Sequence, residues 1–146
     1  MSLVENLEKL SNAYGVAGRE DEVRELLRQM LSPYVDEVKE DKMGNLVCVI
    51  RGESEHPKIM VAAHMDEVGL LVKNITKEGF LQFAKIGGID DRILIAREVV
   101  VLTDRGLVKG VIGSKPPHIL KEEERKKVIE ASDLFIDVGA SSKEEV

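Results

Sequence analysis

Residues 58–69 read Lys-Ile-Met-Val-Ala-Ala-His-Met-Asp-Glu-Val-Gly, an apolar run followed at once by a polar string. A continuous apolar run bounded by polar residues is typical of a strand that is covered on both faces. Residues 58–63 are therefore predicted to form a central strand of a layered α/β sheet. Open α/β sheets bind ligands beyond the carboxyl ends of their strands, where the loops diverge and leave a crevice.

His64 and Asp66 follow this strand directly and are the candidate site residues. In extended backbone, residues two apart point to the same side, so both side chains would face the crevice while Met65 points away. An imidazole beside a carboxylate can bind a divalent metal, or the carboxylate can orient the imidazole. The tripeptide alone is common, and a surface pair without a role is the alternative. Polar groups beside a buried strand, with Gly69 allowing close backbone approach, favour a functional role.

The chain before this strand predicts two helices and a hairpin. A capping box and helical spacing of apolar residues predict a first helix over residues 2–14. A second helical pattern over residues 20–31 carries acidic residues in its first turn and a proline just beyond its end. Residues 35–50 then read as two strands on either side of a turn at residues 42–45.

The pattern changes near residue 70, where a domain boundary is predicted. Short strands with tight turns then follow closely, which is typical of a small barrel or sandwich. A short charged helix at residues 121–130 and a further strand at residues 134–138 complete this half. The predicted fold class is α/β, with residues 1–69 in one unit and a β-rich unit over residues 70–146. The four strands are predicted at residues 70–75, 80–86, 97–102 and 107–112.

Residues 139–146 carry two overlapping capping boxes, the signature of a helix that begins, and the sequence given stops within about one turn. A helix that short does not form alone, because nucleation uses most of a turn before propagation contributes. The chain is therefore expected to be a truncated piece of a longer protein.

Composition excludes several classes of function. A net charge of −6 argues against general affinity for nucleic acid or anionic membranes. No apolar run approaches the roughly 18 residues that a bilayer span requires, and the charged N-terminus differs from a signal peptide, so a cytoplasmic protein is predicted. Cys48 lies within an apolar run and is predicted to be a small buried hydrophobic residue. His56 and His118 are expected to be surface residues.

Several separate segments, in the same order, resemble the M42 family of aminopeptidases over essentially the whole chain. The string AAHMDEVGLLV at residues 62–72 carries most of the resemblance, with the turn MGNLV before it. The other matching segments are KIGGIDDRILIAREVVV at residues 85–101, GVIGSKPPHIL at residues 110–120 and DLFIDVGASSKEEV at residues 133–146.

The resemblance implies a catalytic α/β domain with a two-metal centre, usually of zinc or cobalt, and subunits that assemble into large hollow particles. Residues 1–69 would be the N-terminal part of that domain, and residues 70–146 an inserted, incomplete β-barrel dimerisation domain. His64 would be a ligand of one metal, and Asp66 the catalytic-site carboxylate that orients His64. The remaining ligands and a glutamate base would lie outside this chain.

The expected function is metal-assisted release of N-terminal amino acids from peptides. The chain alone is expected to be inactive and to need the remainder of the enzyme or a second chain. Two alternatives stay open: a non-catalytic assembly module, and a hydrolase of another substrate, such as an esterase, deacetylase or glycosidase, on the same scaffold. Peptide substrate and copies of the chain itself are the expected partners, and nucleic acid and membranes are not.

Overall fold

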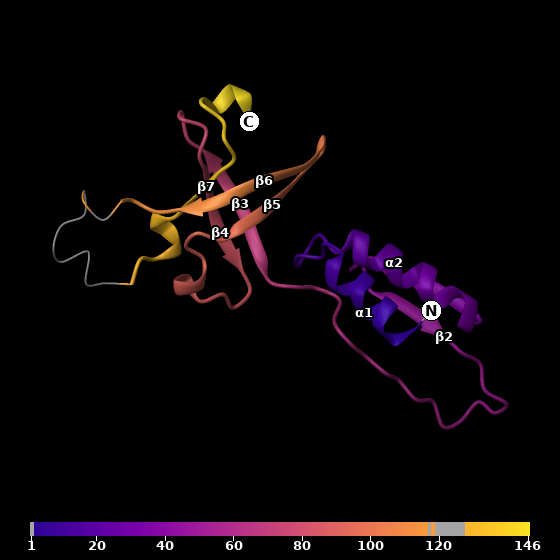
Figure 1. Ribbon diagram of the computed structural model, residues 1–146. Coiled ribbons are helices and arrows are strands. Elements are labelled where there is room, and N and C mark those ends of the chain that lie inside the picture. Colours follow the sequence, from indigo (N-terminus) through magenta and orange to yellow (C-terminus); the bar gives the residue numbers. More distant parts are fainter. Residues whose placement is uncertain (1, 117, 119–127) are drawn as a thin grey trace. The chain divides into compact units, whose positions relative to one another are not determined.

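The structure is a computed structural model that describes residues 2–116, 118 and 128–146 of the 146-residue chain. The chain divides into two compact units, Met1–Glu67 and Val68–Val146 (Figure 1). The described residues contain no helix that is long and apolar enough to cross a membrane. Elements of the first unit are α1 (Leu3–Asn12), α2 (Asp21–Leu31), the 3₁₀ turn η1 (Ser32–Tyr34), β1 (Glu37–Glu40) and β2 (Leu46–Val49).

The first helix begins as its sequence predicts. The Ser2 hydroxyl accepts a hydrogen bond from the Glu5 backbone N–H at 3.2 Å, and the Glu5 carboxylate accepts one from the Ser2 N–H at 2.7 Å. These two bonds form a complete capping box, which satisfies backbone donors that a helix leaves unpaired at its N-terminus. Both predicted helices and the hairpin are confirmed.

Arg24 joins α2 to the hairpin of β1 and β2. Its Nε donates to the Gly44 carbonyl in the hairpin turn at 2.8 Å, and its Nη1 lies 3.5 Å from Glu40 Oε1 on β1. The guanidinium side chain is only 13% exposed. Cys48 on β2 is half-buried, so it is less buried than the sequence predicted.

The predicted central strand at residues 58–63 is also wrong for this structure. Residues 50–66 contain no helix or strand, and the side chains of Ile59, Met60 and Val61 are 86%, 89% and 92% exposed. A strand needs hydrogen-bonding neighbours, and the sheet described in the first unit is the two-stranded hairpin, which pairs with itself. The apolar run therefore remains extended and uncovered.

The second unit is a five-stranded antiparallel sheet that curls into a half-barrel (Figure 1). Its strand order is β3-β4-β7-β6-β5, so β3 and β5 are the two edges. Every strand predicted in this half is confirmed, but the described strands leave these edges unpaired where a closed barrel would have none. The elements are β3 (Gly69–Ile75), β4 (Leu81–Ile86), η2 (Asp91–Ile93), β5 (Glu98–Thr103), β6 (Gly106–Gly113), η4 (Ala131–Asp133), β7 (Phe135–Asp137) and η5 (Lys143–Glu145).

Two predicted helices in this half are not described as α-helices in the structure. The predicted charged helix at residues 121–130 falls mostly on residues outside those described. The predicted helix start near the C-terminus is a single 3₁₀ turn, η5, and the side chain of Ser142 makes no capping hydrogen bond there.

The short strand β7 lies at the centre of the sheet and contributes to its core. Leu81 on β4 pairs with Ile136 on β7, and Ile136 also pairs with Ile112 on β6. A Cβ at Gly110 of β6 would lie 2.6 Å from the Ile136 side chain, so the glycine allows this close packing. The buried core consists of Leu81, Phe83, Leu94, Ile112, Leu134 and Ile136.

Asp91 on η2 contacts both β4 and η4. The Asp91 carboxylate accepts a hydrogen bond from the Ala131 N–H at 3.0 Å and pairs with the Lys85 ammonium. The hydrogen bond from Lys85 lowers the pKa of the Asp91 carboxyl below its usual value, and the bond from Ala131 adds to this effect. The carboxylate is therefore charged at neutral pH, and it holds η2 against β4 and η4.

The core should be sensitive to truncation at Ile112, which is 1% exposed. We expect Ile112→Ala to lower the free energy of unfolding by about 2 to 5 kcal/mol, because it removes buried methyl groups and leaves a cavity. Leu107→Ala on the same strand is the control, since Leu107 is 60% exposed and should change it by less than about 0.5 kcal/mol. Urea unfolding followed by circular dichroism measures both. Equal effects of the two substitutions would contradict this core.

Candidate metal centre

His64 and Asp66 lie near the end of the extended segment and contact each other. Nδ1 of His64 lies 3.2 Å from Asp66 Oδ1 and 3.0 Å from the Asp66 carbonyl oxygen. The two side chains therefore share one side of the backbone, as their spacing predicts. Both are open to solvent, with exposed fractions of 84% for His64 and 44% for Asp66.

The described residues do not complete a metal site. Within residues 2–116, 118 and 128–146, no group of three or more His, Cys, Asp or Glu side chains is placed to hold an ion. A catalytic zinc takes three protein ligands and keeps a fourth position open. His64 and Asp66 supply the right donor chemistry for part of such a site, because the contact at Nδ1 leaves Nε2 for a ligand. They do not fit a catalytic metal by themselves.

Glu67 joins this segment to the loop between α1 and α2. Its backbone N–H donates to the Gly15 carbonyl at 2.7 Å, and the Gly15 N–H donates to Glu67 Oε1 at 3.2 Å. Val16 and Glu67 also form an isolated parallel bridge. The sequence analysis missed this contact, because the two partners are 52 residues apart and neither lies in a periodic pattern.

Gly15 allows the candidate site segment to approach α2 closely. A Cβ at this position would lie 2.6 Å from Val23 Cγ2 and 3.3 Å from the Met65 carbonyl oxygen. Both distances are shorter than ordinary van der Waals contact, so any larger residue would displace Met65 or Val23. The buried Val23 side chain, 7% exposed, fixes this position from the helix side.

The other two histidines do not join this site. His56 and His118 are both exposed, as expected. His56 lies in the polar loop that follows the hairpin, and His118 lies beyond β6 in the second unit.

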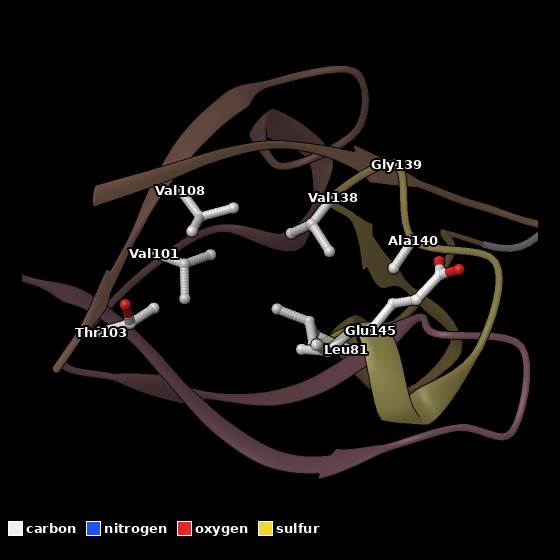
Figure 2. A pocket seen from close by; sticks show the side chains of 9 residues that line it. Leu81, Val101, Thr103, Val108, Val138, Gly139, Ala140 and Glu145 are labelled. Atoms are coloured by element: carbon white, nitrogen blue, oxygen red, sulfur yellow. The ribbon is translucent and has the colours of Figure 1, made fainter. Parts of the chain in front are cut away.

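A pocket of about 290 Å³ lies on the half-barrel of the second unit. Figure 2 shows the side chains of Val101, Val108 and Val138 directed into one shared space, with Leu81 beside them and the Glu145 carboxylate near its rim. Glu145 is the one charged residue in the lining, and the candidate site residues are absent from it. This lining suits apolar packing and offers no set of groups for metal binding or acid–base chemistry.

The architecture of the two units is that of part of a TET-type aminopeptidase. The TET aminopeptidase of Thaumarchaeota archaeon SCGC AB-539-E09 is 46% identical, with a TM-score of 0.93 over 97% of this chain and 39% of that chain. The family model of M42 glutamyl aminopeptidases matches residues 44–146. The chain belongs to this family, which confirms the resemblance found in the sequence.

Two further relatives define what the chain is similar to. Lysyl aminopeptidase of Pyrococcus furiosus is 41% identical over 143 residues, which cover 97% of this chain and 41% of that protein. The TET1 peptidase of Pyrococcus horikoshii, described as assembling into a tetrahedron or a large octahedral shell, is 45% identical with a TM-score of 0.84. That match covers 99% of this chain and 42% of the other. The chain thus spans about two fifths of the length of the relatives it matches.

The incomplete ligand set predicts weak metal binding by this chain. We expect zinc or cobalt added to the purified chain not to be retained after desalting, because a metal held by His64 and Asp66 would keep mostly water ligands. Metal analysis of the desalted protein measures this. Stoichiometric retention that His64→Ala abolishes would contradict the prediction, because other residues of the chain would then have to complete the site.

Proposed function

We propose that the chain is part of a metal-dependent aminopeptidase that releases N-terminal amino acids from peptides at a two-metal centre of zinc or cobalt. The observation that carries this proposal is the match to the M42 glutamyl aminopeptidase family, which includes the segment with His64 and Asp66. The names of the relatives, among them a lysyl aminopeptidase, support the same reaction class. Because the chain spans about two fifths of these relatives, the activity is proposed for a complete enzyme.

In this proposal His64 is a ligand of one metal and Asp66 orients its imidazole. The contact between Nδ1 of His64 and Oδ1 of Asp66, 3.2 Å, supports this division of roles, because a carboxylate on one ring nitrogen fixes the other toward a ligand. The remaining ligands and the proton acceptor would come from outside this chain. The described pair alone does not provide a site for hydrolysis.

We also propose distinct roles for the two halves of the chain. Residues 1–69 would be the N-terminal part of the catalytic α/β domain, and residues 70–146 an incomplete inserted dimerisation domain of β-barrel type. The division of the chain between Glu67 and Val68 supports two units, and the two open sheet edges suit a barrel that lacks part of its strands.

A non-catalytic assembly module is the second candidate. The observation that favours it is apolar exposure on the edge strand β5, where Val100 and Leu102 are 39% and 45% exposed. A relative is described as assembling into closed shells, and apolar patches on edge strands promote association. The two candidates are compatible if the same chain both assembles and supplies part of the site.

The chain alone should release no amino acid from aminoacyl substrates, even with excess zinc or cobalt, because its metal site is incomplete. A chimaera in which it replaces the matching segment of the Pyrococcus lysyl aminopeptidase should be active. In that chimaera, His64→Ala should abolish activity and lower metal content, and Asp66→Asn should lower activity about 10- to 100-fold. Peptidase assays and metal analysis measure these effects.

The exposed loop residue Glu55 provides the control for this series, and Glu55→Ala should leave activity and metal content unchanged. Full metal content and normal turnover in His64→Ala would refute the proposed ligand. If the chimaera hydrolyses esters, acetylated amines or glycosides but not peptides, the proposed substrate class is wrong and the assignment of the scaffold stands.

The assembly role predicts a defined dimer or larger oligomer of the purified chain. We expect Val100→Lys on β5 to shift the protein to monomer in light scattering, because a lysine on an edge strand opposes pairing with another chain. Val61→Lys, in the uncovered segment of the first unit, should remove only concentration-dependent aggregates. A wild-type chain that stays monomeric at every concentration would contradict the assembly role.

A further inference from the structure

Glu67 and Gly15 exchange two hydrogen bonds across 52 residues of sequence. The Glu67 N–H donates to the Gly15 carbonyl, and the Glu67 carboxylate accepts from the Gly15 N–H, so each residue serves the other as donor and acceptor. A hydrogen bond from a backbone N–H to a carboxylate is stronger than one between neutral groups. This reciprocal contact, called the Glu67–Gly15 clamp below, is a specific attachment and not a chance approach of two loops.

The clamp is the attachment point nearest to His64 and Asp66. Upstream, the Arg51 N–H donates to Asp36 Oδ2 at 2.6 Å and holds the start of the extended segment. Between Arg51 and Glu67, the described hydrogen bonds join neighbours within the segment, such as the Ser54 hydroxyl to a nearby carbonyl and the contact of His64 with Asp66. Among the described hydrogen bonds, the clamp is therefore the nearest one that attaches the backbone of His64 and Asp66 to the rest of the first unit.

The direction of the Glu67 side chain separates it from the candidate ligands. In extended backbone, His64 and Asp66 point to one side while Met65 and Glu67 point to the other. The Glu67 carboxylate is engaged with the Gly15 N–H in the loop between α1 and α2, whereas His64 and Asp66 contact each other. The described contacts therefore separate the Glu67 carboxylate from the His64–Asp66 pair.

We propose that Glu67 is a positioning residue, whose carboxylate holds the His64–Asp66 segment against the loop between α1 and α2 through Gly15 without binding the metal. The inference rests on the proposed function only for the statement that His64 is a metal ligand. The clamp itself is a property of the first unit and can be tested in this chain. Two experiments separate these statements.

The first experiment measures amide hydrogen exchange by NMR in the purified 146-residue chain. Glu67→Ala should speed exchange at the Gly15 amide about ten-fold or more, because its charge-assisted hydrogen bond is lost. Glu67→Gln should keep most of the protection, since the glutamine oxygen can still accept that bond. Exchange at Gly15 that is the same in Glu67→Ala and in the unsubstituted chain would overturn the clamp.

Glu20→Ala is the matched control for this experiment. Glu20 Oε1 accepts from the Gly18 N–H at 2.6 Å, so this substitution also removes one negative charge and one carboxylate–glycine bond from the same loop. It removes in addition the 3.8 Å pairing of Glu20 Oε2 with Arg24 on α2. Glu20→Ala should speed amide exchange at Gly18 and leave the exchange rates of the Gly15 and Glu67 amides unchanged. Equal loss of protection at Gly15 in both variants would overturn a specific role for Glu67, because general loosening of the loop would explain it.

The second experiment uses the active chimaera with the Pyrococcus enzyme. Glu67→Ala should lower kcat about ten-fold with little change in KM, since it moves the site and leaves peptide contacts alone. Glu67→Gln should restore most of kcat. A metal ligand or general base needs the negative charge, so a Glu67→Gln chimaera as inactive as Glu67→Ala would overturn the positioning role.

Failure of the proposed function gives a different pattern. If the chimaera with the unsubstituted chain binds metal but releases no amino acid, the aminopeptidase assignment fails. The exchange measurements then decide the clamp alone, with the same two outcomes as above.

Discussion

A β-strand needs hydrogen-bonding neighbours. This requirement explains which extended segments of the chain form a sheet and which remain exposed to solvent. In the second unit β7 enters between β4 and β6, and Ile136 pairs with residues of both, so the core closes around it. The strands β3 and β5 each pair on one side only. In the first unit the apolar run at residues 58–63 has no neighbouring strand among the described elements, and its side chains remain in solvent.

The parts of this fold that the sequence predicted are those set by local physics. The capping box at Ser2 and Glu5, the acidic first turn of α2 and the tight turn that joins the short strands β5 and β6 each depend on residues close in sequence. The apolar run at residues 58–63 has equally strong local character. It failed as a prediction because a buried strand depends on partners elsewhere in the chain, which a pattern in one segment cannot supply.

The candidate site divides in the same way. The contact of His64 with Asp66 follows from the period of two in extended backbone, and the structure places the two side chains 3.2 Å apart. The contact of Glu67 with Gly15 joins two segments with no shared period, so only the three-dimensional structure shows it. The number of metal ligands is likewise a non-local property, and the described residues supply too few.

The two kinds of contact together explain how an incomplete site can still have a defined geometry. The reciprocal bonds between Gly15 and Glu67 close a long loop within the first unit, and the entropy cost of that closure grows only slowly with loop length. The buried Val23 on α2 also lies close to this glycine, so the end of the extended segment is attached to the loop between α1 and α2. A neighbouring strand that later covered residues 58–63 would therefore meet a segment whose carboxyl end is already anchored. His64 and Asp66 lie one to three residues before this anchor, so the backbone that carries them is attached to the first unit close to their own positions.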